Sequence, residues 1–234
     1  MKSTLRKFLS RNQPRTAPEL TFADYVAERL GIWSEAPPVP GALVFLGDSQ
    51  IERGRWNEWW PQKPILNRGI GGETIAGVAA RLDEVIRHVP PLIVLECGAN
   101  DLAESKPLNT SVRDFSNLLS QLRARLPDCT LWIQGVLPAH RVQWRDRPPT
   151  ESTARALALN SQVRALNEQL EDQSRSHKAF FLNLHPSFEA EGMLRAECTL
   201  DGLHLNGTGY RVWREALQHQ APPEIAAILG SSPH

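Results

Sequence analysis

The sequence has little cysteine and no long apolar run. Its apolar segments all stay short of the ~18 residues that a membrane-spanning helix needs, so we expect no membrane span. Its cysteines are Cys97, Cys129 and Cys198, an odd number without a C-x-x-C pair. This pattern argues against a zinc ribbon and against a dense disulfide framework. A chain of 234 residues can bury a core without metal or disulfide support.

An excess of charge of either sign is also missing. The 26 basic side chains balance 26 acidic ones, which gives a formal net charge of zero. A general nucleic-acid binder needs a basic excess to neutralise phosphates, so we expect no nucleic-acid partner. No G-x-G-x-x-G follows the first apolar segment and no Gly-Lys-Ser/Thr occurs, which argues against a nucleotide-binding protein. The composition excludes no small-molecule substrate.

The first 40 residues differ from the rest of the chain. Residues 1–15 carry five Lys or Arg but lack the apolar core and cleavage site of a secretory signal. We interpret them as a solvated basic tail, with an organellar presequence as the alternative. Thr21 and Asp24 then predict the capping box of a short helix, which a proline-rich linker follows. We expect a basic tail and helical arm over 1–40, one domain over 41–234, and a cytoplasmic location.

From residue 41 onward, short apolar segments alternate with helical patterns. Strands are predicted at 42–46, 65–66, 92–97, 131–136 and 179–184. Apolar residues at a 3.6-residue period predict helices over 75–86, 112–126, 159–170 and 210–217, the second of them capped by Ser111 with Asp114. Continuously apolar strands separated by helices indicate a parallel sheet covered on both faces. We therefore predict a three-layer α/β domain.

Polar segments that contain glycine follow the first three predicted strands. They hold Ser49, Gly72 and Asn100, and ligands of such sheets bind at the carboxyl edge of the strands. Backbone N–H groups at a helix start after Ser49 would stabilise an oxyanion, and Gly72, opening the next helix, would allow close approach of a ligand. Each residue alone also has a simpler interpretation: Ser49 as a helix cap, Gly72 and Asn100 as turn formers.

One Asp-x-x-His pair occurs in the chain, Asp201 and His204 before the last main helical pattern. A serine nucleophile needs a base, and the base needs a group that orients it. A three-residue spacing on a turn can place both side chains on one face. A solvated turn and a metal ligand are the alternatives for this pair alone.

Taken together, these segments resemble the SGNH (GDSL-type) hydrolase family of esterases and lipases, over about 43–213. The closest resemblance is to small acetylhydrolases, lysophospholipase-like esterases and the catalytic subunits of platelet-activating-factor acetylhydrolase. It implies a three-layer flavodoxin-like sandwich with a five-stranded parallel sheet of order 2-1-3-4-5, no metal and no cofactor. The matching blocks are Gly47-Asp48-Ser49, Gly69-Ile70-Gly71-Gly72, Gly98-Ala99-Asn100-Asp101 and Asp201-x-x-His204.

The resemblance also implies a role for each matched residue. Ser49 corresponds to the nucleophile, His204 to the base and Asp201 to the group that orients it. The N–H groups of Ser49 and Gly72 and the side-chain amide of Asn100 correspond to the oxyanion hole. No metal ligand is implied.

Two positions depart from the family pattern. Gln50 stands where Leu or Ile is usual, and Ala99 where Thr or Gly is common. Both adjoin the matched atoms without supplying them, so they bear on subfamily more than on activity. After the fourth predicted strand, we expect His140, Arg141 and Trp144 to line the leaving-group side of the site, with a surface loop as the alternative.

These observations predict a serine esterase that hydrolyses short-chain, most simply acetyl, esters of small molecules. A lysophospholipase or thioesterase for longer acyl chains and a non-catalytic binding module of the same fold are the alternatives, and homo-oligomers are possible. We interpret the tryptophans at 56, 59 and 60 as core residues rather than as a lipid anchor. Cys97 is likewise interpreted as a core residue rather than as a second nucleophile.

Overall fold

The computed structural model describes residues 20–141 and 149–230, without the side chains of 149 and 150. The chain divides into two compact units, Met1–Ala36 and Pro37–His234. In the first unit, helix α2 spans Phe22–Ser34 and begins at the predicted capping box. The Thr21 hydroxyl accepts the Asp24 N–H at 3.2 Å, and the Asp24 carboxylate accepts the Thr21 N–H at 2.9 Å.

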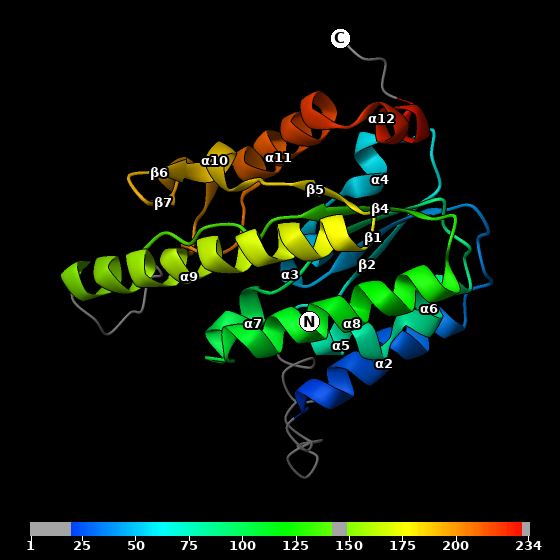
Figure 1. Ribbon diagram of the computed structural model, residues 1–234, viewed down its shortest axis with the longest axis horizontal. Helices are drawn as coiled ribbons and strands as arrows, with labels where there is room; N and C mark the ends of the chain where they lie inside the picture. Colours follow the sequence, from blue (N-terminus) through cyan, green and yellow to red (C-terminus); the bar gives the residue numbers. More distant parts are fainter. Residues whose placement is uncertain (1–19, 142–148, 231–234) are drawn as a thin grey trace, which may run out of the picture. The chain divides into compact units, whose positions relative to one another are not determined.

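Five parallel strands form the sheet of the second unit (Figure 1). Their order is β2-β1-β3-β4-β5, as predicted. The chain enters at β1, adds β2 on one side and then crosses to β3 on the other, so the order reverses around β1 and the carboxyl ends of these strands border the crevice. The strands are β1 Leu43–Gly47, β2 Ile65–Gly69, β3 Leu92–Glu96, β4 Thr130–Gln134 and β5 Phe180–Leu182.

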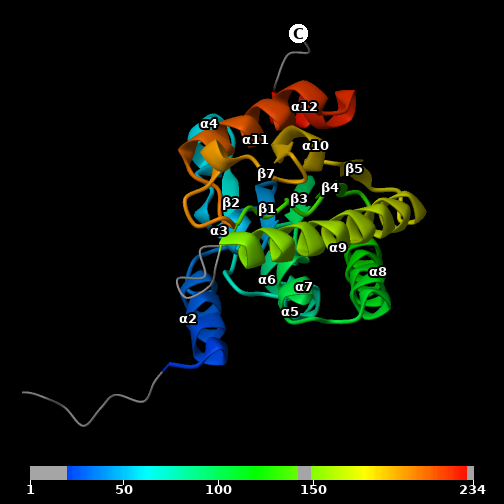
Figure 2. The ribbon, with the colours of Figure 1, turned by 90° about the vertical axis from the view of Figure 1, so that its left-hand side faces the viewer.

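Helices cover both faces of the sheet, which gives the predicted three layers (Figures 1 and 2). One face packs against α5 Ile75–Ala80, α6 Leu82–Ile86, α8 Leu108–Arg125 and α9 Pro149–Ser176. The other packs against α4 Trp56–Trp59, α10 His185–Phe188, α11 Gly207–Gln220 and α12 Pro223–Leu229. Shorter elements are α3 Ser49–Arg53, α7 Ala99–Ala103, β6 Glu189–Ala190, β7 Met193–Leu194 and the 3₁₀ helix η1 Ala196–Cys198.

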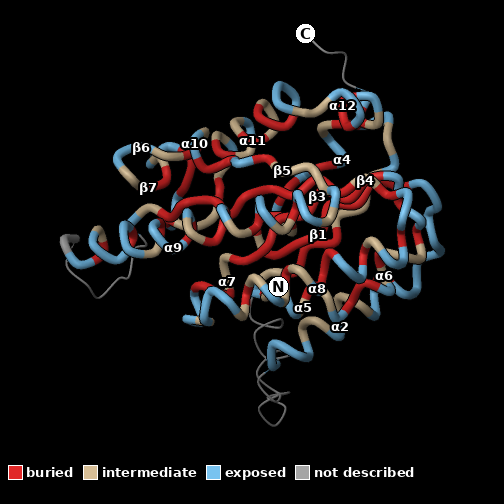
Figure 3. Tube along the Cα trace, in the orientation of Figure 1, coloured by how far each residue is buried: buried red, intermediate tan, exposed pale blue. Residues whose placement is uncertain are grey.

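Alternate strand residues feed two separate cores. Val44 and Leu46 of β1 point into one, and Leu43 and Phe45 into the other, so every residue of the strand is buried (Figure 3). Trp56 is fully buried and stacks on Phe45 with ring centroids 4.3 Å apart. A tryptophan held in this way belongs to the core, as predicted, and is not available as a lipid anchor.

The predicted cap of the second helix is wrong. Helix α8 begins at Leu108 after Pro107, and Ser111 lies buried inside it. Pro107 ends the preceding segment and has no N–H to place in a helix, so the helix starts one turn before the apolar pattern does. Asp114 instead pairs with Lys106, with its oxygen 2.9 Å from Nζ.

The single helix predicted over 75–86 is two helices. Arg81 interrupts it with φ −116° and ψ 20°. Its guanidinium turns inward, where it pairs with Glu73 and donates to the carbonyls of Gly47 and Arg68 at 3.2 and 2.9 Å. The apolar period continues across the break, which is why the sequence pattern did not reveal it.

Candidate active site

The hydroxyl of Ser49 can face His204 because a neighbouring residue, and not Ser49, caps the helix that begins here. Asp48 is the N-cap of α3, and its Oδ1 accepts the Gln50 N–H at 3.0 Å. Ser49 is the first helical residue, and its Oγ lies 3.0 Å from Nε2 of His204. The simpler interpretation of Ser49 as a helix cap is therefore wrong.

His204 is in turn oriented by Asp201. The imidazole Nδ1 lies 2.7 Å from Asp201 Oδ2, and the other carboxylate oxygen accepts the N–H groups of Leu203 and His204 at 2.9 and 2.8 Å. Partial burial raises the pKa of Asp201, but these hydrogen bonds outweigh it and lower the pKa to about 2. A charged Asp201 favours the tautomer with a proton on Nδ1, which leaves the Nε2 lone pair directed at Ser49.

The loops after β2 and β3 meet beside Ser49. Asn100 Nδ2 donates to the Glu73 carbonyl at 2.8 Å and lies 3.4 Å from Asp48 Oδ2. Gly72, one residue before Glu73, has φ 87°, a region that favours glycine. It lies in a turn ahead of Thr74, which caps α5, and so does not open the helix as predicted. The three loops are thus joined by hydrogen bonds that run through Asn100.

Of the predicted substrate-lining residues that the structure describes, His140 contacts this region through its backbone. Its backbone N–H donates to the carbonyl of Gly202 at 2.7 Å, and Gly202 lies between Asp201 and His204 in the sequence. Arg141 is exposed, and Trp144 lies outside the described residues. A role in substrate binding stays a prediction for all three.

Buried acids underlie the site. Glu96 ends β3 and pairs in register with Gly47 of β1, so its side chain lies next to Asp48. Burial raises the pKa of Asp48 to about 7, against the hydrogen bond from the Gln50 N–H, which lowers it. Burial and the neighbouring Asp48 also raise the pKa of Glu96 well above its usual range. Both carboxyls thus favour their protonated forms more strongly than solvated ones do.

A buried ion pair braces the loop that carries Gly72. The Glu73 carboxylate lies 2.6 Å from the Arg81 guanidinium, and both side chains are almost fully buried. The sequence assigned no role to either residue, and for Arg81 the reason is that charged side chains in a helical pattern are usually solvated. The only available signal was the acid directly after the glycine block.

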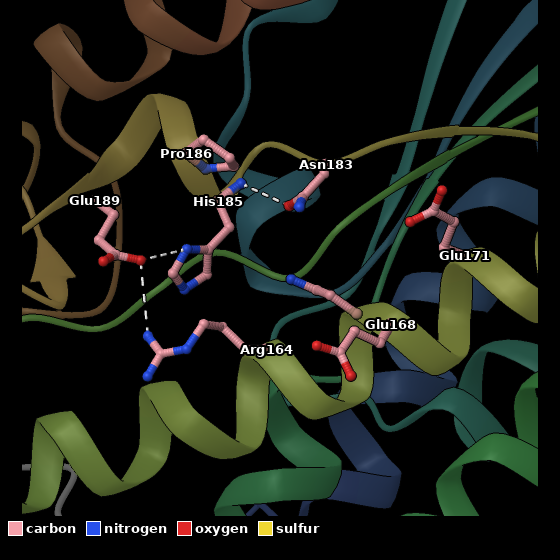
Figure 4. A pocket seen from close by; sticks show the side chains of 8 residues that line it. Arg164, Glu168, Glu171, Asn183, His185, Pro186 and Glu189 are labelled. Carbon is pink, nitrogen blue, oxygen red and sulfur yellow. Dashed lines mark hydrogen bonds and ion pairs between the residues drawn. The ribbon is translucent and has the colours of Figure 1, made fainter.

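A separate polar pocket of about 420 Å³ lies between α9 and α10 (Figure 4). Glu189 accepts from His185 Nδ1 at 2.8 Å and lies 3.7 Å from Arg164. Burial lowers the pKa of His185. None of the predicted site residues lines this pocket.

Among the described residues, no group of three or more His, Cys, Asp or Glu is arranged to hold a metal ion. Within the same ranges, no helix has the length and apolar character needed to cross a membrane.

Comparison with known protein families identifies the family of this chain. The model of the GDSL-like lipase/acylhydrolase family matches residues 45–212. The chain belongs to this family. It is accordingly a carboxylic ester hydrolase, and the match spans Ser49, Gly72, Asn100, Asp201 and His204.

Individual proteins similar to this family member act on acetyl esters or share its fold. An isoamyl acetate-hydrolyzing esterase of Saccharomyces cerevisiae is 24% identical over 166 residues, covering 69% of this chain and 70% of the yeast protein. A GDSL-like lipase from Bacteroides thetaiotaomicron has 24% identity, a TM-score of 0.63, and coverage of 86% and 98%. An acetylxylan esterase from Geobacillus stearothermophilus has 14% identity, a TM-score of 0.61, and coverage of 83% and 96%.

The raised pKa of Asp48 predicts a pH-dependent difference in stability between the protein and its Asp48→Asn variant. Above pH 4 the unfolded chain loses the Asp48 proton while the folded chain keeps it up to about pH 7. The wild-type protein therefore has its full stability with respect to Asp48 below pH 4 and loses part of it as the pH rises from 4 to 7. The variant, which keeps the acceptor for Gln50, should gain on the order of 2–4 kcal/mol relative to the wild type across this window.

Urea unfolding at pH 4, 5.5, 7 and 8 measures this difference. The exposed Asp83→Asn variant is the control, and its stability relative to the wild type should change by less than about 0.5 kcal/mol. A relative stability of Asp48→Asn that does not change with pH would show that Asp48 titrates normally.

Proposed function

We propose that the protein hydrolyses acetyl and other short-chain esters through an acyl-enzyme on Ser49. The observation that carries the proposal is the hydrogen-bonded series from Ser49 Oγ through His204 to Asp201, with distances of 3.0 and 2.7 Å. A nucleophile, a base and an orienting carboxylate in this order are the elements of a serine hydrolase triad. The family assignment supports the same reaction class.

In the first half of the reaction, His204 Nε2 takes the proton of Ser49 as Oγ attacks the ester carbonyl carbon. The negative charge that develops on the carbonyl oxygen is stabilised by the N–H groups of Ser49 and Gly72 and by the Asn100 amide. Asp201, with its pKa lowered to about 2, remains charged and stabilises the imidazolium. The tetrahedral intermediate then collapses, and His204 gives its proton to the leaving alcohol.

In the second half, water replaces the alcohol. His204 removes a proton from the water, which attacks the acyl carbon, and the same oxyanion donors stabilise the second tetrahedral intermediate. Collapse releases the carboxylic acid and returns the proton to Ser49 Oγ. The base must start unprotonated, so the reaction begins from the neutral imidazole of His204.

Support for an acetyl group comes from the relatives. The yeast protein is an esterase for isoamyl acetate, and the Geobacillus neighbour is an acetylxylan esterase. Longer acyl chains are the second candidate, and a series of chain lengths separates the two. On the leaving-group side, His140 and Arg141 are proposed to contact the alcohol portion, since His140 adjoins the loop that carries His204.

Ser49→Ala should abolish turnover of p-nitrophenyl esters of two to twelve carbons. Loss of a triad nucleophile costs about 10⁴–10⁶ in kcat, and the wild-type rate should be highest for the acetate. Ser120→Ala is a matched control, because Ser120 Oγ also lies 3.1 Å from a histidine Nε2, that of His177. Equal turnover by the wild type and Ser49→Ala would overturn the proposal, and a maximum at long chains would replace acetyl by longer acyl groups.

Asn100→Ala should lower kcat about 10²–10³-fold with little change in KM, because an oxyanion donor acts mainly in the transition state. Steady-state kinetics on p-nitrophenyl acetate measure the effect. Asn206→Ala serves as the control: Asn206 caps α11 close to His204, with its side chain 3.1 Å from the Gly209 N–H. That variant should lose about 1 kcal/mol of stability and keep its kcat. An Asn100→Ala enzyme with wild-type kcat would exclude Asn100 from the oxyanion hole.

A further inference from the structure

The residue after the nucleophile is a buried glutamine, where the family usually has an apolar Leu or Ile. Gln50 is only 4% exposed. A primary amide has two N–H donors and an acceptor oxygen, and burying them without partners is costly. A glutamine buried beside Ser49 therefore needs hydrogen-bond partners for both ends of its amide.

Both ends of the Gln50 amide bind the backbone of the loop that carries the base. Nε2 donates to the carbonyl of Leu203 at 2.8 Å, and Oε1 accepts the N–H of Leu205 at 3.4 Å. These two residues flank His204. One side chain thus engages the chain on either side of His204, from the position next to Ser49.

Bonds inside the loop fix its shape but not its distance from Ser49. Thr199 Oγ1 donates to the His204 carbonyl at 2.8 Å and accepts the Gly202 N–H at 2.9 Å. Asp201 Oδ1 accepts the N–H of His204 at 2.8 Å. All of these partners lie within seven residues of one another and would move together if the loop moved.

Packing restrains the ends of the loop, where Cys198 and Leu205 are buried in the core, more than the stretch between them. The side chain of Asp201 is 52% exposed and that of His204 is 19% exposed. Leu200, at the start of the loop, is 82% exposed. The exposed stretch between these ends depends more on hydrogen bonds from outside the loop, of which the bond from the His140 N–H to the Gly202 carbonyl is one and those of Gln50 are others.

We propose that Gln50 is a positioning residue that holds His204 at hydrogen-bond distance from Ser49. The inference rests on the proposed function, because it assigns a role relative to the Ser49–His204 pair. The backbone carbonyl of Gln50 also accepts the Tyr210 hydroxyl at 2.7 Å, which ties the start of α11 to the same point. The Gln50 amide thus makes two hydrogen bonds to the loop that a Leu or Ile side chain at this position cannot make.

The test replaces Gln50 by Leu, the family's own residue, and by Met, which keeps the length of glutamine and removes both hydrogen bonds. In each variant kcat for p-nitrophenyl acetate should fall about 10- to 100-fold, since misplacing a catalytic group by about 1 Å costs this much. KM should stay within about threefold, because the Gln50 side chain is buried and its amide is bound to the backbone of the loop that carries His204. The rate at which an organophosphate inactivates the enzyme at Ser49 should fall by the same factor as kcat.

Gln134→Met is the matched control. Gln134 is a fully buried glutamine on β4, and neither atom of its amide has a hydrogen-bond partner within the described residues. The substitution should leave kcat and the inactivation rate unchanged. A fall in this variant as well would mean that loss of any buried glutamine impairs the enzyme, and would overturn the specific role of Gln50.

Other outcomes are equally decisive. Folded Gln50→Leu and Gln50→Met enzymes with wild-type kcat would overturn the inference while Ser49→Ala still abolishes turnover and upholds the proposed function. Turnover that survives in Ser49→Ala would overturn both. If Leu and Met prevent folding, the nearly isosteric Gln50→Glu decides: it keeps the acceptor for the Leu205 N–H, replaces the donor toward Leu203, and should show the same loss of kcat with unchanged KM.

Discussion

The parallel pairing of β1 with both β2 and β3 is the constraint on which the site depends. Parallel strands end at the same edge, so the loops after these three strands meet although their residues are far apart in the sequence. The hydrogen bonds of Asn100 to Glu73 at 2.8 Å and to Asp48 at 3.4 Å are the direct result. His204 comes from the other end of the chain, 155 residues after Ser49, and needs attachments of its own.

The site is built over groups that are costly to bury. Asp48, Glu73, Glu96 and Asp101 are each no more than 1% exposed. Arg81 compensates Glu73, and Lys106 compensates Asp101 with a contact of 2.9 Å. Asp48 and Glu96 instead favour their protonated forms, as their raised pKa values indicate. Such a layer of acids is expected where function rather than stability determines the residues.

Much of the fold could be predicted from the sequence because its signals are strong. The fully buried strands are continuous apolar runs, and the order of the sheet followed from the resemblance carried by four spaced motifs. The Asp201–His204 spacing indicated a pair that the structure places in direct contact. In these segments the local sequence pattern and the overall fold favour the same structure, which makes the prediction reliable.

The parts that could not be predicted depend on contacts between distant residues. The break at Arg81 arises from a guanidinium that turns inward toward Glu73, while the apolar period runs on across it. The amide of Gln50 binds backbone 153 and 155 residues away, and no local pattern indicates such partners. Ser111 met the rule for a helix cap, yet Pro107 set the start of the helix earlier.

The central claim is that Ser49 is the nucleophile, activated by His204. Peptide mapping by mass spectrometry after reaction with an organophosphate tests it most directly, because the reagent forms a stable covalent bond with an activated serine. The account predicts one adduct, on Ser49, with loss of esterase activity in proportion to labelling. An adduct on another residue with the same loss of activity, or full labelling of Ser49 with activity retained, would contradict it.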